Sequence, residues 1–269
     1  LQWAQRMFRL PMEGRELRVI VRSNGRIALS AEGTAEGAAS WFLGELAGST
    51  RRVAQPPDAR EIEQLLQEKD EQGKDKLRFI NRFVYTDDPA LLERFPAPEG
   101  RRLAIQIKAD GQIFLVAPAA TTKERDRYLG KFVLKGGQVF SKDSPELAAA
   151  ELRAETLRRL LTDRAELIER ATETDHAALL AWAERLFRLP MAGRRLVITT
   201  RANGRIGLAA QATAEGGASW FLGELTGPGL DLNTPLTDDI LTDLLRQPGR
   251  TFIKRVLYTD DTALTARLP

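Results

Sequence analysis

The sequence has no cysteine and a single histidine, His176, among its 269 residues. The absence of cysteine excludes disulfides, thiolate metal sites and cysteine nucleophiles, and it suits a reducing compartment. One histidine cannot supply a multi-histidine metal site. These absences remove several common catalytic and metal-binding arrangements, so we expect no cofactor and favour a non-enzymatic role.

Long apolar runs and a large charge imbalance are missing too. No stretch approaches the roughly 18–20 apolar residues that a membrane-spanning helix needs. No signal-peptide pattern is visible, which favours a cytoplasmic location. The net charge is +3 and hydrophobic residues make up 43% of the chain, a balance typical of a globular protein. The small net charge indicates a mixed-charge surface and only weakly suggests a nucleic-acid partner.

The strongest feature that is present is a long internal repeat. Residues 3–48 align without a gap to residues 182–227, with 31 identities in 46 positions. Residues 79–96 align to residues 252–269 with 11 identities in 18. Repetition over this length is typical of a duplicated folding unit.

A fainter copy lies between the two close ones. Residues 100–118 follow the apolar pattern of residues 14–32, including the central glycine. We therefore predict three hairpin-centred segments, with boundaries at 1–96 (first repeat unit), 97–174 (diverged hairpin module and helical spacer) and 175–269 (second close copy).

Each segment is predicted to contain a β-hairpin. Alternating apolar residues flank Asn24-Gly25, Asp110-Gly111 and Asn203-Gly204. Such dipeptides tolerate the positive φ angles of a type I′ turn between two strands. The sequence therefore predicts three hairpins with this turn type.

Helices are predicted to follow the outer hairpins. Residues 34–48 and 213–227 begin with Thr34 and Thr213 as candidate caps and end at glycine. A polar helix, a strand and a short closing helix come next in each copy, and residues 145–190 favour a nearly all-helical spacer. The predicted fold class is α+β: a tandem repeat of helix–β-hairpin–helix modules with a helical spacer.

The hairpin tips are the first candidate binding sites. Two arginines flank each outer turn, and two guanidinium groups beside a rigid turn could clamp a phosphate or a carboxylate. A solvated turn with flanking charges is the simpler alternative. The candidate residues are Arg22, Asn24, Arg26, Arg201, Asn203 and Arg205.

Trp41 and Trp220 occupy equivalent positions in the two close copies. Their spacing is typical of core residues on a helix face. Tryptophan is also enriched at binding hot spots, so each could anchor a partner.

The sequence Tyr-Thr-Asp-Asp occurs twice, and its carboxylates are the remaining candidates. Thr86 and Thr259 would cap the closing helices, with the aspartates placed favourably against the helix dipole. The alternative is a divalent-metal site, although Mg²⁺ commonly needs substrate phosphates as well. The aspartates concerned are Asp87, Asp88, Asp260 and Asp261.

The repeats favour a non-enzymatic interaction or scaffold module, because repetition gives extended and similar surfaces. A helical pattern begins at the first residue and the sequence ends in the middle of a repeated segment. Arginine, alanine and leucine are abundant. We therefore expect a piece of a larger bacterial protein whose partner is another protein. The alternatives are nucleic-acid binding through the arginine-flanked tips and a metal-dependent enzyme that uses the aspartate pairs.

Overall fold

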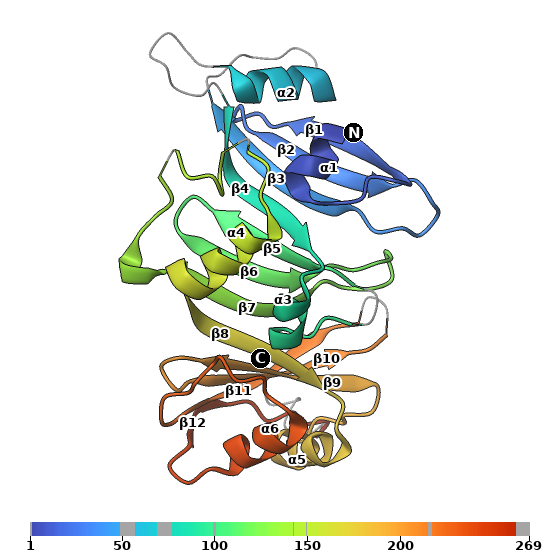
Figure 1. Cartoon of the computed structure of the whole chain (residues 1–269). Coiled ribbons are helices and arrows are strands. Elements are labelled where there is room, and N and C mark those ends of the chain that lie inside the picture. The colour runs from blue at the N-terminus through green and yellow to red at the C-terminus, as the bar shows by residue number, and fades with distance from the viewer. Residues whose placement is uncertain are drawn as a thin grey trace. The chain divides into compact units, whose positions relative to one another are not determined.

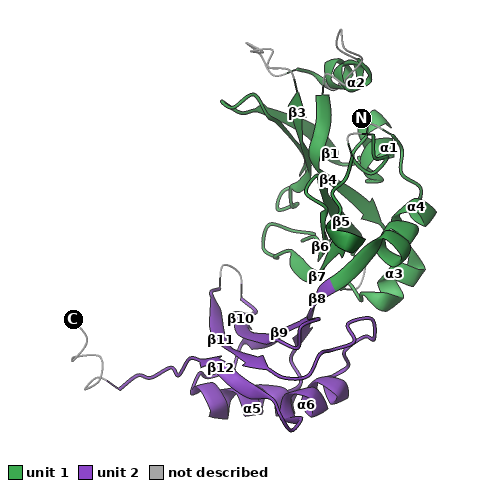
Figure 2. Cartoon of the chain, turned by 90° about the vertical axis from the view of Figure 1, so that its left-hand side faces the viewer, with its two compact units in different colours: residues 1–167 green, residues 168–269 purple. Residues whose placement is uncertain are grey.

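The protein, seen in a computed structural model, is described over residues 2–48, 57–68, 77–98, 101–141, 143–148, 150–214 and 217–261. The chain divides into two compact units, residues 1–167 and 168–269 (Figure 2). Within the described ranges the fold is α+β, with twelve strands and six short α-helices. The strands form one antiparallel meander in which each strand pairs with the next along the chain.

The first unit holds most of the helices. Its elements are α1 (Gln2–Phe8), β1 (Arg15–Val21), β2 (Ile27–Gly33), β3 (Trp41–Gly48), α2 (Ala59–Gln67), β4 (Leu77–Thr86), α3 (Pro89–Arg94), β5 (Leu103–Lys108), β6 (Gln112–Ala117), β7 (Arg127–Leu134) and α4 (Ala154–Arg159). A 3₁₀ turn, η1 (Lys135–Gly137), follows β7, and a π-helical turn, η2 (Leu160–Arg164), follows α4.

The second unit repeats the order of elements from α1 to β4. Strand β8 (Ala165–Thr174) crosses the boundary between the units. The elements after it are α5 (Ala177–Phe187), β9 (Arg194–Arg201), β10 (Ile206–Ala212), β11 (Ser219–Thr226), α6 (Asp238–Arg246) and β12 (Thr251–Arg255).

One pattern of elements, a helix, three strands, a helix and a strand, occurs three times along the chain (Figure 1). We call these stretches repeat 1 (α1 to β4), repeat 2 (α3 to β8) and repeat 3 (α5 to β12). The last strand of one repeat pairs with the first strand of the next, as β4 with β5 and β8 with β9. The three predicted hairpins are confirmed as β1–β2, β5–β6 and β9–β10.

Helices cover one side of the strands in each unit, as α1, α3 and α4 do in the first and α5 and α6 in the second (Figure 2). The fully buried Phe8 packs edge-to-face on Phe79, with ring centroids 5.7 Å apart. Phe187 packs the same way on Phe252, at 5.8 Å. Because these pairs join a leading helix to the last strand of its own repeat, the first and last elements of a repeat share one core.

The helices predicted after the outer hairpins are wrong: strands β3 and β11 occupy those positions. Thr34 and Thr213 cap nothing, because their hydroxyls donate hydrogen bonds to the carbonyls of Gly14 and Gly193, each at 3.0 Å. The module is therefore a hairpin extended by a third strand, and no helix–hairpin–helix repeat is present in the described residues.

Glycines inside these third strands explain why the segments are not helical. The pairing register between the second and third strands shifts beside Gly44, Gly130 and Gly223. A Cβ atom on Gly44 would lie 2.6 Å from the carbonyl oxygen of Asn81, and one on Gly223 would lie 2.6 Å from that of Lys254. Glycine is needed here for the close approach of two backbones at a β-bulge.

The predicted helical spacer at residues 145–190 is wrong near its middle. Helices α4 and α5 lie within it, but residues 165–174 form β8. Six residues of β8, from Glu169 to Thr174, pair with β9. The backbone N–H and C=O groups of these residues therefore form hydrogen bonds in the sheet and not within the predicted helix.

The hairpin turns differ from the predicted type I′. Gly25, Gly111 and Gly204 have φ angles of 78°, 86° and 82°, while the residue before each has no positive φ. In the first hairpin, Gly25 N–H donates to the carbonyl of Arg22, and Arg22 N–H donates to the carbonyl of Arg26. This is a three-residue loop, a type I turn followed by a glycine bulge.

The polar helices predicted at residues 59–72 and 237–247 are confirmed as α2 and α6, and the strand predicted at 77–86 as β4. The strand predicted at residues 251–259 is present as β12 over Thr251–Arg255. Residues 69–72 of the first polar helix, and all of the closing helix predicted after Thr259 except residues 260 and 261, lie outside the described residues.

Candidate functional site

Both arginines of the first hairpin tip face one carboxylate. Arg22 and Arg26 lie 3.5 and 3.6 Å from the carboxylate of Glu45, a β3 side chain that is 12% exposed. Asn24 Oδ1 accepts a hydrogen bond from the backbone N–H of Arg26, at 3.1 Å. The side chains of this tip are thus engaged within the fold.

The tip in repeat 3 has the same arrangement with one more acid. Arg201 lies 2.8 Å from Glu224 and 3.1 Å from Glu169, and Arg205 lies 3.6 Å from Glu224. Asn203 Oδ1 accepts from the backbone N–H of Arg205, at 3.1 Å. An incoming phosphate would have to displace these carboxylates from the arginines. Phosphate binding by the tip arginines therefore stays a prediction, and Glu169 and Glu224 would compete with the phosphate.

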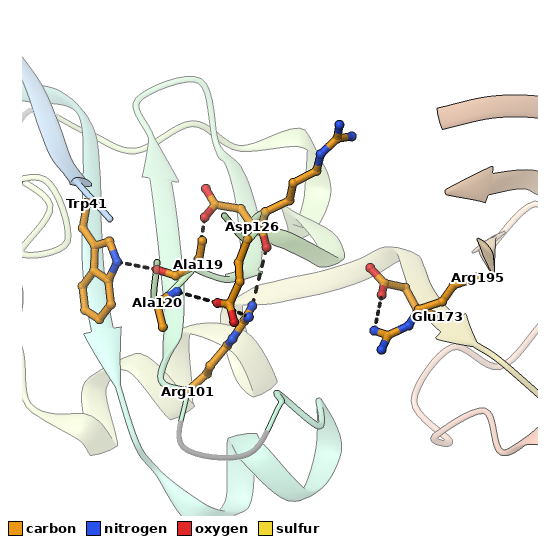
Figure 3. Close-up of polar contacts among 9 residues, drawn as sticks. Trp41, Arg101, Ala119, Ala120, Asp126, Glu173 and Arg195 are labelled. Carbon is orange, nitrogen blue, oxygen red and sulfur yellow. Dashed lines mark hydrogen bonds and ion pairs between the residues drawn. The ribbon is translucent and has the colours of Figure 1, made fainter. Parts of the chain in front are cut away.

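The two candidate tryptophan anchors lie on strands and are half-buried. The Trp41 indole N–H donates to the carbonyl of Ala119, at 2.7 Å (Figure 3). The guanidinium of Arg15 lies 4.0 Å from the Trp41 ring centroid, and that of Arg194 lies 4.2 Å from the Trp220 ring centroid. One face of each indole therefore holds an arginine, in a cation–π contact.

Asp88 is the N-cap of α3, and the predicted cap at Thr86 is wrong. Its Oδ1 accepts from the backbone N–H groups of Ala90 and Leu91, at 3.0 and 3.3 Å. The hydroxyl of Thr86 instead accepts from the N–H of Asp88 itself, at 3.1 Å. The threonine fixes the turn, and the aspartate caps the helix.

The two aspartate pairs have different surroundings in the two copies. Asp87 pairs with Arg102 at 3.2 Å, and Asp88 also accepts from Arg158 at 2.6 Å. Asp260 and Asp261 are exposed. Among the described residues no group of three or more aspartate, glutamate or histidine side chains is arranged to hold a metal ion.

Changing Asp88 to asparagine should make the protein less stable in a pH-dependent way. The hydrogen bond from Arg158 and those from the helix backbone hold the pKa of Asp88 below its ordinary value. Its stabilising contribution is therefore present above the unfolded-state pKa of about 3.9 and is lost as the pH falls through the lower folded-state pKa. Asparagine keeps the cap oxygen and loses the charge.

Urea unfolding of the wild type and Asp88→Asn from pH 7 to pH 2 measures this effect. We expect a gap between the two unfolding free energies at pH 7 that closes at the acid end. A gap of constant size across the range would contradict the ion pair as its cause.

Arg82, on β4, is the most deeply buried cation among the described residues, with none of its surface exposed. Five backbone carbonyls accept hydrogen bonds from its guanidinium at 2.6–3.5 Å: those of Met7, Pro145, Glu146, Ala148 and Ala150. Burial lowers the pKa of Arg82 to about 9, and the negative charge of Glu146 opposes this shift. Arg82 thus ties α1 and the link before α4 to the last strand of repeat 1.

Arg170 has the equivalent role in the last strand of repeat 2. It lies on β8 and is 3% exposed. Its Nε donates to the carbonyl of Leu232 at 2.7 Å, and its Nη2 to that of Asn233 at 3.4 Å. Both carbonyls belong to the link before α6, so each arginine fixes the link before the second helix of the following repeat.

Arg255 is the third member of this series, and it is exposed. Its Nε donates to the carbonyl of Leu186 at 3.2 Å, and its Nη2 contacts the same oxygen. This carbonyl matches that of Met7 in repeat 1. Arg82 and Arg170 each donate to carbonyls of the link before the second helix of the next repeat. Within the described residues of the chain, no such link carbonyl accepts a hydrogen bond from Arg255.

A hollow of about 470 Å³ lies beside α1 in the first unit. Two of its arginines form ion pairs, Arg6 with Glu63 at 3.8 Å and Arg102 with Asp87 at 3.2 Å. A third arginine in its wall donates to a backbone carbonyl. The cations around the hollow are therefore engaged, and it offers no prepared anion site.

His176 lies at the N-cap position of α5 without a capping hydrogen bond from its side chain.

None of the helices in the described ranges has the length and apolar character needed to cross a bilayer. No protein-family model matches the chain, and neither a curated protein nor a solved structure gives a match. Function therefore has to be inferred from the geometry and chemistry of the chain itself.

Proposed function

We propose that the protein is a non-enzymatic scaffold that binds other polypeptide chains. The supporting observation is the series of three repeats joined strand to strand through β4–β5 and β8–β9. Among the described strands, β1 and β12 stand at the two ends of this series, and each pairs with one strand only. Exposed strand edges accept a further strand, and repeated surfaces suit extended contacts.

The tip arginines and the first aspartate pair have structural partners, which also favours this proposal. The tip arginines face Glu45 and Glu224. Asp88 caps a helix and pairs with Arg158. These groups already form contacts that stabilise the fold, whereas a strand edge presents backbone N–H and C=O groups that can pair with another strand.

Competed capture tests the scaffold proposal. The tagged full chain is incubated with extract of its source organism, with and without excess untagged protein, and retained proteins are quantified by mass spectrometry. We expect a small set of proteins that the untagged chain displaces and that nuclease treatment leaves in place. A profile in which the competitor displaces no protein contradicts the proposal.

The hairpin tips provide the control for nucleic-acid binding. Fluorescence anisotropy with labelled DNA and RNA at low salt compares the wild type with the double variant Arg26→Glu, Arg205→Glu. The scaffold proposal expects no difference between the two proteins. Binding that falls steeply with salt and is lost in the variant would replace it with nucleic-acid recognition through the tips.

A further inference from the structure

Two positions on or just after the last strand of repeat 3 are more exposed than their counterparts in repeat 1, and one of them is also more exposed than its counterpart in repeat 2. Leu257, just after β12, is 54% exposed, whereas the matching Val84 of repeat 1 is fully buried. Arg255 is exposed, whereas the matching Arg82 and Arg170 are 0% and 3% exposed. In repeats 1 and 2 the next repeat contributes to this environment, because its first strand lies beside β4 or β8 and the link before its second helix accepts hydrogen bonds from the arginine. In repeat 3, β11 is the one described strand that pairs with β12.

The first strand of repeat 1 has the complementary property. β1 matches β5 and β9 in sequence position, yet its only partner among the described strands is β2. Arg22 N–H donates to the carbonyl of Arg26, just before β2. Because hydrogen-bonded and non-bonded pairs alternate in an antiparallel ladder, the backbone N–H and C=O of Val19 point away from β2. Ile20 on this strand is 42% exposed. β1 is thus a strand of the type that covers β4 and β8, with its pairing edge unused.

The two internal junctions use one register. In each junction, an arginine and the threonine four residues later pair with equivalent positions of the next strand. Between β4 and β5, Arg82 pairs with Ile107 and Thr86 with Leu103. Between β8 and β9, Arg170 pairs with Thr200 and Thr174 with Leu196. By the same rule, Arg255 falls opposite Val21 and Leu257 falls opposite Val19. The internal junctions are therefore a template for a contact between copies.

We propose that the β12 edge of one molecule pairs with the β1 edge of a second copy of this chain, antiparallel and in this register. The proposal rests on the scaffold function and names its partner. Val256 N–H donates to the carbonyl of Leu222, so the backbone of Leu257 points away from β11. Leu257 and Val19 then exchange both backbone hydrogen bonds, as an antiparallel pair does.

The side chains support the same junction. Leu257 then lies beside Val19 of the second copy, as the fully buried Val84 lies beside Ile105 of β5. The exposed Ile20 of the second copy falls opposite Val256, which removes apolar surface from water on both edges. Because the two surfaces differ, the contact is head-to-tail and leaves a free end on each side, so larger assemblies add one molecule at a time.

Paired proline variants of the full 269-residue chain test this junction. Val19→Pro and Leu257→Pro each remove one N–H that points outward, a change that an edge strand tolerates. Val19→Ala and Leu257→Ala are the matched controls, since they keep the N–H. Circular dichroism melts check that all four variants are folded.

Sedimentation velocity over a rising concentration series gives the readout. We expect dimers and larger species for the wild type and both alanine variants, and monomers alone for each proline variant. A mixture of the two proline variants should form a heterodimer and nothing larger, because one intact β12 edge and one intact β1 edge remain.

Three results would overturn the proposal: a wild type that stays monomeric at the highest soluble concentration, a dimer that both proline variants retain, or a mixture that yields no heterodimer. The scaffold function fails separately, in the competed capture. A monomeric wild type that still retains proteins from the extract rejects the self-pairing alone.

Discussion

Replacing Arg82 with alanine is expected to lower the free energy of unfolding by about 3–5 kcal/mol, the usual range for removing one partner from a buried charged network. The guanidinium has no exposed surface and donates to five carbonyls from two separate segments. Without it, those carbonyls remain in a site closed to water, which accounts for most of the loss. Urea unfolding followed by circular dichroism measures the effect.

Two further variants identify the cause. Arg82→Lys keeps the charge but replaces the planar fork with a single ammonium group, so we expect only partial recovery. Arg255→Ala removes the matching but exposed arginine of repeat 3 and should lower stability by less than about 1 kcal/mol. Equal losses for Arg82→Ala and Arg255→Ala would show that burial of the guanidinium is not what matters.

Phe187→Ala is the second substitution with a large expected effect, again about 3–5 kcal/mol. The ring is fully buried and packs edge-to-face on Trp182 at 6.0 Å and on Phe252 at 5.8 Å. Removing it leaves a cavity between α5 and β12 and breaks both aromatic contacts. Hydrogen exchange measured by mass spectrometry should show faster exchange in residues 168–269.

Phe8→Ala is the matched substitution in the first unit, with ring distances of 5.9 Å to Trp3 and 5.7 Å to Phe79. We expect a loss of similar size, with the faster exchange now in residues 1–167. If either variant loses less than about 1 kcal/mol, the site has collapsed around the missing ring and the proposed equivalence of the two cores is wrong.

Local patterns predicted the elements whose formation depends on nearby residues. The three hairpins followed from alternating apolar residues around Asn-Gly or Asp-Gly, and α2 and α6 were predicted from their polar, helix-favouring sequences. The segment containing Trp41 was mispredicted because its glycines resemble helix ends. Gly44 is required by the close approach of the neighbouring strand's backbone at Asn81, and no local pattern carries that information.

The arginine series was missed for a similar reason. Arg82 binds carbonyls 63–68 residues further along the chain, a contact that no local spacing reveals. A usable signal did exist: an arginine followed four residues later by a threonine occurs in β4, in β8 and, as Arg255 and Thr259, in and just after β12. The helical pattern that extends across residues 165–174 conceals this signal, because it assigns β8 to the spacer.

The chain-order pairing of the strands has a kinetic consequence. The ladders of the three hairpins, β1–β2, β5–β6 and β9–β10, each close over a few residues, so little loop-closure entropy is lost when they form. A nucleus formed at any one hairpin can grow by adding its neighbours in turn, as in other linear arrays. During synthesis, the earliest strands could therefore begin to pair while the ribosome is still adding the last ones.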